Sequence, residues 1–539
     1  MTSKKTAIGS VTFIGAGPGD PGLLTVRAAE VIAAADVVIY DSGLPEAIIA
    51  RANAQAELIA VSADGPIEGS DVLVVADGAK AAVEAAKAGA FVARVLKGDP
   101  ITDGSLASEG TVVTKAKLAI EVVPGVARVT GVPGYVGVAL LGGKSHDVHV
   151  LDSISSTNWV NQQAAALVIV NSTSSVEQID SAVAGLLQAG RDPMSPISIT
   201  VRGTTTDQRT AVGTLGEFAL MAKPIAALGD LSDAIVIVGE VLASRDRFSW
   251  FETKSLFGWK VLVPRTRDQA GVLGEQLIAS GAIPVEVPTI SVEPPRTPQQ
   301  MERAVHGLVS GRYQWVAFTS ANAVKAVREK FEEYGLDARA MAGLKIAAIG
   351  ESTAAALVEF GVRPDLIPTG EQSSVGLLQD WPQYDDLLDP INRVFLPRAD
   401  IATETLVEGL TKLGWEVDDV TAYRTVRAAP PPAHTREQIK TGGFDAVVFT
   451  SSSTVRNLIG IAGKPHATTV VACIGPATAE TATEHGLRID VLAPEPTIES
   501  LAQALAEFGH QARQDAIDAG ETVWRPSEKR NAARRKSKS

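Results

Sequence analysis

The chain has 539 residues, of which 45% are hydrophobic and 21% charged, a balance typical of a folded globular protein rather than a disordered or fibrous one. A single cysteine, Cys473, excludes an internal disulfide, and the seven histidines show no metal-ligand spacing, so the sequence predicts no metal site. The net charge of -13 disfavours nucleic acid as a general partner. Without a long apolar run or a signal peptide, no membrane association is expected, and the expected location is the cytoplasm.

Short apolar runs rich in β-branched residues alternate with Ala- and Leu-rich stretches along almost the whole chain, beginning with VTFIG and LLTVRAAEVIAAA. This alternation predicts an α/β fold with largely parallel sheets. Residues 243–257 are charged and aromatic, and we interpret them as a linker between two halves. Residues 509–539 end in a segment with seven Lys or Arg from Arg525 onward, and they are expected to form a basic, disordered tail.

The first half opens with TFIGAGPGDPGLLTVRAAEVIAAADVVIYDSGL and continues through VLKGDP, EVVPGVARVTGVPGYVGV and VRGTTTDQRTAVGTLGEF. These segments resemble uroporphyrinogen-III C-methyltransferases, which are tetrapyrrole methylases. The resemblance implies two domains, 9–145 and 146–242, a homodimer formed through this half, and S-adenosylmethionine as cofactor. The implied cofactor-binding residues are Pro18, Asp41, Gly98, Asp99 and Gly203.

This half departs from the family's pattern at six places where the cofactor and the methyl transfer would lie, and residues 97, 128 and 171 are among them. Lys97 replaces a glycine, Arg128 replaces an alanine, and Asn171 replaces a methionine. Long cationic side chains would fill space that the ligand needs, or would leave a buried charge unpaired. We therefore expect this half to bind S-adenosylmethionine weakly or not at all, and to serve as a scaffold, a channel wall or a dimerisation surface.

The second half contains an internal repeat. The segments VLVPRT, FTSAN and AAIGESTAAAL begin at residues 261, 318 and 347, and VFLPRA, FTSSS and ACIGPATAETA follow at 394, 449 and 472. Each is a buried-type strand that leads into a helical pattern. Open α/β sheets bind ligands at the carboxyl ends of their strands, where helix starts present free N–H groups. The repeat therefore predicts two related units with several anion-binding helix starts.

The order of these segments over residues 258–508 resembles uroporphyrinogen-III synthase. The resemblance implies two α/β lobes, 258–292 with 426–508 and 293–425, joined by the strand-like segments PVEVPTISVEP and WEVDDVTAYRTV. It also implies a reaction that needs no cofactor: hydroxymethylbilane, a linear tetrapyrrole, is closed to uroporphyrinogen III with inversion of the last pyrrole.

The implied substrate carries eight carboxylates, so its site needs donors at strand ends and helix starts. Tyr423 is the candidate catalytic residue, because a phenol can donate a hydrogen bond to the departing hydroxyl. The candidate substrate-binding residues are Arg265, Arg267, Thr319, Ser320, Asn322, Gly350, Thr353, Arg398, Ser451, Ser452, Gly475 and Thr478. Ser, Thr and Asn at such positions are also preferred helix caps whatever the function, and an arginine there can simply pair with an acid.

Three functions fit these patterns. The first is a synthase in tetrapyrrole biosynthesis with a methylase-like first half, and the second is a bifunctional enzyme that makes precorrin-2. Both would take hydroxymethylbilane as the small-molecule partner. The third is a two-lobed ligand-binding protein without catalysis, because cleft-forming α/β lobes also serve as sensors.

Overall fold

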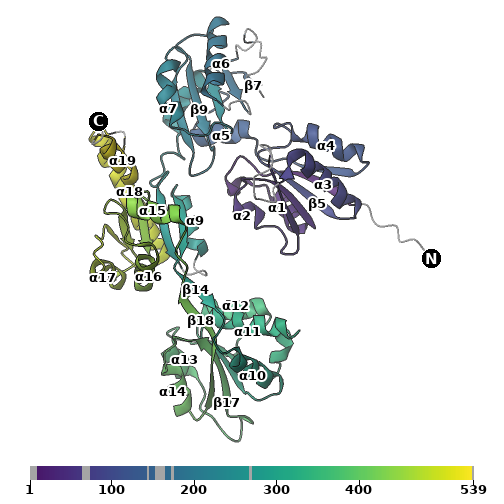
Figure 1. Ribbon diagram of the computed structural model, residues 1–539, viewed down its shortest axis with the longest axis vertical. Helices are drawn as coiled ribbons and strands as arrows, with labels where there is room; N and C mark the ends of the chain where they lie inside the picture. The colour runs from purple at the N-terminus through teal and green to yellow at the C-terminus, as the bar shows by residue number, and fades with distance from the viewer. Residues whose placement is uncertain are drawn as a thin grey trace, which may run out of the picture. The chain divides into compact units, whose positions relative to one another are not determined.

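The computed structural model describes residues 9–62, 73–142, 145–151, 159, 164–170, 175–265, 270–521 and 523–536. The chain forms two compact units, each described below by itself. The first runs to Lys260 and includes Glu275–Ile283 and Ala506–Trp524, and the second holds most of the remaining residues to the C-terminus. Helices and sheets alternate throughout both units, which confirms the predicted α/β class (Figure 1).

The first unit begins with a six-stranded parallel sheet in the order β4-β3-β2-β5-β1-β6. Its strands are β1 (Ser10–Gly15), β2 (Val37–Asp41), β3 (Glu57–Ser62), β4 (Leu73–Val74), β5 (Phe91–Leu96) and β6 (Ala119–Val123). Its helices are α1 (Val26–Ala34), α2 (Glu46–Ile49), α3 (Val75–Lys87) and α4 (Ser105–Lys115). Helices α1 and α2 cover one face of the sheet, and α3 and α4 cover the other. The loops at the carboxyl ends of β1, β2 and β5 therefore lie at one edge.

The second sheet of this unit is mixed, in the order β10-β9-β11-β8-β7. Its strands are β7 (Val148–Leu151), β8 (Ala166–Ile169), β9 (Pro196–Val201), β10 (Arg209–Thr214) and β11 (Ile235–Val238). Its helices are α5 (Arg128–Val136), which connects the two sheets, α6 (Val176–Gln188) and α7 (Ala222–Ala226). Strand β11 is antiparallel to both β8 and β9. Val132 and Val136 of α5 pack among buried residues of β8 and β11.

Residues 243–257, expected to be a linker, form part of the first unit. After helix α8 (Arg245–Phe248), the ring of Tyr135 lies 5.0 Å from that of Trp250 and 4.7 Å from that of Phe251. Trp250 Nε1 donates a hydrogen bond of 3.0 Å to Gly134 O. The aromatic side chains in this segment bury apolar surface, and this burial holds the segment in place.

The second unit has two five-stranded sheets, in the orders β13-β12-β19-β20-β21 and β14-β18-β17-β15-β16. The strands of the first are β12 (Lys260–Arg265), β13 (Ile283–Pro288), β19 (Ala446–Phe449), β20 (Val470–Cys473) and β21 (Val491–Leu492). Those of the second are β14 (Ile290–Glu293), β15 (Trp315–Phe318), β16 (Lys345–Ala348), β17 (Arg393–Ala399) and β18 (Glu416–Arg427). Strands β14 and β18 pair antiparallel, with Ile290 opposite Arg427, so the two segments expected to connect the lobes do pair with each other.

Helices follow most of these strands. The first sheet is accompanied by α9 (Ala270–Ala279), α15 (Ala433–Thr441), α16 (Ser452–Ala462) and α17 (Pro476–Glu484). The second is accompanied by α10 (Pro298–Val309), α11 (Ala321–Glu333), α12 (Glu351–Phe360), α13 (Ser374–Asp380) and α14 (Thr405–Lys412). Helices α10, α11 and α12 pack on one face of this sheet, and α13 and α14 pack on the other.

The expectation of a disordered tail over residues 509–539 is wrong. Helix α18 (Ile498–Asp518) runs into this region, and helix α19 (Pro526–Lys536) follows it. The ring of Trp524 lies 5.8 Å from that of Trp259, and Ser527 N donates a hydrogen bond of 2.9 Å to the buried Asp445. An aromatic contact and a hydrogen bond to a buried carboxylate therefore help to order a segment in which basic residues outnumber acidic ones. Among the described residues, no helix is both long enough and apolar enough to span a membrane.

Candidate functional site

Tyr423 and Ser320 meet in the sheet of the second unit that contains β15, β17 and β18. Tyr423 Oη lies 2.9 Å from Ser320 Oγ, and either hydroxyl can donate the hydrogen bond. Ser320 follows β15 and caps α11, because its Oγ accepts a hydrogen bond of 3.1 Å from Ala323 N. Only 8% of Tyr423 is exposed. The pairing of β17 with β18 shifts register between Arg398 and Ala399, where Ala399 faces Tyr423. Such irregularities re-aim side chains beside functional sites.

The predicted helix starts lie where the repeat placed them. Ser320 and Ser451 are the N-caps of α11 and α16, and Gly350 and Gly475 are the N-caps of α12 and α17. Ser452 Oγ donates a hydrogen bond of 3.0 Å to Ala477 O and so ties α16 to α17. Because β15 pairs with β16 and β19 pairs with β20, each sheet carries two adjacent helix starts. Each pair is a candidate carboxylate site.

The remaining predicted residues of the two lobes lie at or near these helix starts. Thr353 and Thr478 occupy matching positions in α12 and α17, and both are buried. Asn322, in the first turn of α11, lines a surface groove together with residues of α12, whereas Thr319 is the residue between β15 and the Ser320 cap.

Gln372 is a residue of this region that sequence reasoning missed. Its Oε1 accepts a hydrogen bond of 3.2 Å from Glu351 N, the first N–H of α12. A Cβ at Gly350 would lie 2.6 Å from the same oxygen, so a larger residue there would require the Gln372 side chain to move. Gln372 stands 21 residues beyond Glu351 in no recognisable motif, and only the fold brings the two together.

The described arginine candidates are engaged within their own lobes. The buried Arg398 contacts Asp419 and Glu404, with an Nε–Oδ1 distance of 2.6 Å to Asp419. Hydrogen bonding to the Asp419 carboxylate raises the pKa of the Arg398 guanidinium. Arg265 forms an ion pair of 2.6 Å with Glu286. The third candidate, Arg267, lies outside the described residues.

In the first unit, the predicted cofactor residues gather around the start of α5. Gly98 has a φ of +81° and exchanges two backbone hydrogen bonds, of 3.0 and 2.8 Å, with Gly17. The buried Asp99 accepts a hydrogen bond of 3.0 Å from Gly125 N, three residues before α5 begins. These contacts therefore join the residues that follow β1 and β5 to the residues that precede α5.

Pro18 and Gly203 reach the same helix from two sides. A Cβ at Gly131 would lie 2.8 Å from Pro18 Cγ, and a Cβ at Gly203 would lie 2.5 Å from Val132 Cγ2. Asp20 also contacts the Gly203 loop and α5. Its N–H donates a hydrogen bond of 3.0 Å to Thr204 Oγ1, and its carboxylate accepts one of 2.5 Å from the Tyr135 hydroxyl. Burial raises the pKa of Tyr135.

The carboxylate of Asp41, also a predicted cofactor residue, already has partners. One oxygen accepts a hydrogen bond of 2.9 Å from Lys97 N, and the other lies 2.7 Å from Arg94 Nη2. Arg94 is 1% exposed and pairs with Glu109, which is also buried. Asp41 is therefore part of an ionic network with the buried Arg94 and Glu109.

Two of the departures from the methylase pattern, Lys97 and Arg128, converge on Asp233. Lys97 Nζ lies 3.4 Å from Asp233 Oδ2, and Arg128 Nη2 donates to Asp233 O at 3.5 Å. The Asp233 carboxylate also accepts from Arg202 N at 3.2 Å. Asn171 lies outside the described residues. Sequence reasoning missed Asp233 because it precedes β11 in an ordinary turn.

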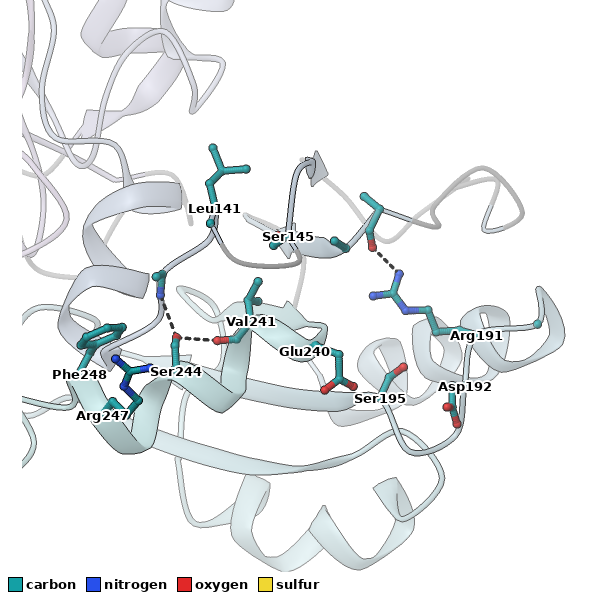
Figure 2. Close-up of a pocket in the computed structure, with 15 residues that line it drawn as sticks. Leu141, Ser145, Arg191, Asp192, Ser195, Glu240, Val241, Ser244, Arg247 and Phe248 are labelled. Carbon is teal, nitrogen blue, oxygen red and sulfur yellow. Dashed lines mark hydrogen bonds between the residues drawn. The ribbon is translucent and has the colours of Figure 1, made fainter.

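A cavity of about 970 Å³ lies at the opposite edge of the second sheet of this unit. Ala165 and Ser195, which precede β8 and β9, line it, whereas Gly203 follows β9. Figure 2 shows Arg191 in its wall, with Nη1 donating a hydrogen bond of 2.8 Å to Ala164 O. The cavity is lined by none of the predicted site residues.

Comparison with known proteins assigns both halves. Residues 271–503 match the family described as uroporphyrinogen-III synthase HemD, and residues 10–219 match the tetrapyrrole (corrin/porphyrin) methylases. A porphyrin biosynthesis protein HemD from Ruminiclostridium josui is 31% identical over 527 residues, which cover 93% of this chain and 98% of that protein. The chain belongs to the HemD family. It is an enzyme with a uroporphyrinogen-III synthase domain in its second half, as the sequence predicted.

Two further relatives match about half of this HemD-family chain. An S-adenosyl-L-methionine-dependent uroporphyrinogen III methyltransferase from Methanosarcina barkeri is 31% identical over 249 residues, which cover 44% of this chain and 94% of that protein. Siroheme synthase 2 from Aeromonas hydrophila is 34% identical over 265 residues, which cover 47% of this chain and 53% of that protein. The chain therefore spans about half the length of this siroheme synthase. The first half belongs to the methylases, in agreement with the predicted resemblance.

Proposed function

We propose that the second half cyclises hydroxymethylbilane to uroporphyrinogen III, with inversion of the last pyrrole. The observation that carries the proposal is the contact between Tyr423 and Ser320 beside the start of α11. It places two coupled hydroxyl groups at the carboxyl end of a sheet, where α/β proteins bind ligands. The family match over residues 271–503 supports the same reaction.

Tyr423 acts as the proton donor in this proposal. The hydroxymethyl group of the substrate loses its oxygen, and the pyrroles stabilise the resulting cation. The Tyr423 phenol donates a hydrogen bond to the departing hydroxyl, and Ser320 Oγ donates to Tyr423 Oη in turn. Ser320 is held in place because its Oγ also accepts from Ala323 N. A chain of hydrogen bonds polarises each member and strengthens the donor at its end.

The helix starts supply the binding energy for the carboxylates. The starts of α11 and α12 in one sheet, and of α16 and α17 in the other, present N–H groups and a partial positive charge to anions. These N–H groups hold the substrate by its acetate and propionate groups, and Tyr423 positions the reacting carbon. Arg398 has a structural role in this proposal, because acids of its own lobe neutralise it.

S-adenosylmethionine, the cofactor named for the Methanosarcina barkeri relative, does not fit the first half as this chain builds it. The backbone junction of Gly98 with Gly17 and the buried Asp99 provide the scaffold for such a site. The side chain of Arg128, however, runs beside Gly98, with Cδ 3.3 Å from the position of a Cβ there. We propose that the first half is a non-methylating scaffold, and that any dimer forms through it.

One experiment tests both statements. The purified full-length chain is given hydroxymethylbilane, with and without S-adenosylmethionine, and the type I, type III and methylated products are separated. We expect the type III isomer in both reactions and no methylated product. The spontaneous type I isomer alone would contradict the synthase proposal and favour a binding protein. Methylated product would show the bifunctional enzyme instead.

A further inference from the structure

Two cationic side chains of the first domain extend to the domain that follows it. Lys97 stands directly after β5, and Arg128 is the first residue of α5. Both reach Asp233, which precedes β11 in the second sheet: its carboxylate lies 3.4 Å from Lys97 Nζ, and its main-chain carbonyl accepts a hydrogen bond of 3.5 Å from Arg128 Nη2. One residue of the second domain therefore receives both side chains.

Asp233 is itself fixed by the loop that contains Gly203. Its two carboxylate oxygens each accept from Arg202 N at 3.2 Å. Arg202 has a φ of +48°, a conformation that few non-glycine residues adopt. Its side chain is secured by an ion pair of 2.7 Å with Asp207 and by a hydrogen bond of 3.0 Å to Leu228 O. Asp233 is thus held by a loop residue that makes several contacts of its own, whereas the Lys97 side chain is partly exposed.

We infer that the carboxylate of Asp233 determines the specificity of the first half: it holds the Lys97 side chain across the space beside Gly98, next to Arg128, and thereby excludes S-adenosylmethionine. The inference rests on the proposed function, in which this region retains the scaffold of a cofactor site. Its new element is Asp233, because an untethered lysine side chain could turn into solvent and admit a ligand. Asp233 acts through Lys97 and is a positioning residue.

The expected size of the effect follows from the contacts. The ion pair between Lys97 and Asp233 joins partly exposed groups at 3.4 Å, and such pairs are individually weak. A ligand that must first displace the Lys97 side chain loses affinity in proportion to the fraction of open protein. We therefore expect release of this side chain to tighten binding of S-adenosylmethionine by roughly two- to fivefold.

The test is a thermodynamic cycle on the full-length chain, with S-adenosylmethionine titrated calorimetrically. The variants are Asp233→Ala, Lys97→Ala, and the double variant that combines them. We expect each single variant to bind roughly two- to fivefold more tightly than the unmodified chain. The double variant should bind no more tightly than Lys97→Ala, because the effects of two residues that act through one contact are not additive. Asp180→Ala removes an exposed acid from α6 of the same domain and should change nothing.

A second substitution at Asp233 keeps the inference testable if Asp233→Ala does not fold. Asp233→Asn keeps a side-chain oxygen for Arg202 N but weakens the hold on Lys97, so it should shift affinity in the same direction as Asp233→Ala. The inference is overturned if the unmodified chain already binds at micromolar concentration, if neither Asp233 variant gains affinity, or if the double variant gains the full product of the separate effects. The synthase proposal is judged separately, by the isomer formed from hydroxymethylbilane.

Discussion

The hydroxyl oxygens of Tyr423 and Ser320 lie 2.9 Å apart, although 103 positions separate the two residues in the chain. They meet because β17 pairs with both β15 and β18, which brings the end of β15 close to the middle of β18. The two hydroxyls are coupled, so removing either one should affect the other's hydrogen bonding.

Tyr423→Phe should lower turnover of hydroxymethylbilane by roughly ten- to a thousandfold, the lower-to-middle range for loss of a positioned proton donor, while the fold survives. Ser320→Ala should lower turnover less, because the phenol remains, and it should also lower stability by about 1 kcal/mol through loss of a helix cap. Ser373→Ala is the matched control: it removes the cap of α13, which accepts from Gly376 N at 3.1 Å, away from Tyr423. Initial rates and thermal unfolding separate the two effects. An unchanged rate for Tyr423→Phe would leave the tyrosine with a packing role only.

Arg398→Ala should lower the free energy of unfolding by about 2 kcal/mol, because it leaves Asp419 without its charged partner and opens space at a buried position. Arg393→Ala, in the same strand, removes an exposed ion pair with Glu416 and should change stability by less than about 1 kcal/mol. Urea unfolding measures both. If Arg398→Ala left stability intact but raised KM, the arginine would be a substrate ligand after all.

Phe251→Ala should destabilise the first unit by about 3 kcal/mol, since Phe251 is 3% exposed and its ring lies 4.7 Å from that of Tyr135. Trp250→Ala should have a smaller effect, because 48% of Trp250 is exposed. Hydrogen exchange of the loop around Asp20, which Tyr135 holds, should rise in the Phe251 variant. Equal, small effects of both substitutions would mean that residues 243–257 are a spacer, as first expected.

Burial raises the pKa of the Cys473 thiol to about 11, from the ordinary value of 9.0. A disulfide reagent at pH 8 should therefore modify the folded chain slowly, with roughly one thiol in a thousand ionised, and modify it completely in denaturant. Because the folded state raises this pKa, the thiol's contribution to stability is complete below about pH 9 and is lost as the pH rises toward 11. Cys473→Ala should remove this part of the pH dependence. Rapid modification of the folded chain at pH 8 would contradict the burial of this thiol.

The sequence by itself determined the layers of this protein. The alternation of β-branched and helical segments specified the α/β class, and the repeated strand ends placed the caps Ser320, Gly350, Ser451 and Gly475. It also anticipated the pairing of β14 with β18. These features depend on local propensity and on periodicities of a few residues, which a sequence displays directly.

Only the tertiary structure decided which side chains are already engaged. Arg398 looked available for substrate until the fold placed Asp419 and Glu404 beside it. Asp233 and Gln372 carried no signal at all, because their partners lie 136 and 21 residues away. Residues 243–257 and the C-terminal helices were misjudged for the same reason: a few buried aromatic contacts order a charged segment, and those contacts form between elements distant in the chain. Such contacts depend on strand order, which local sequence does not specify.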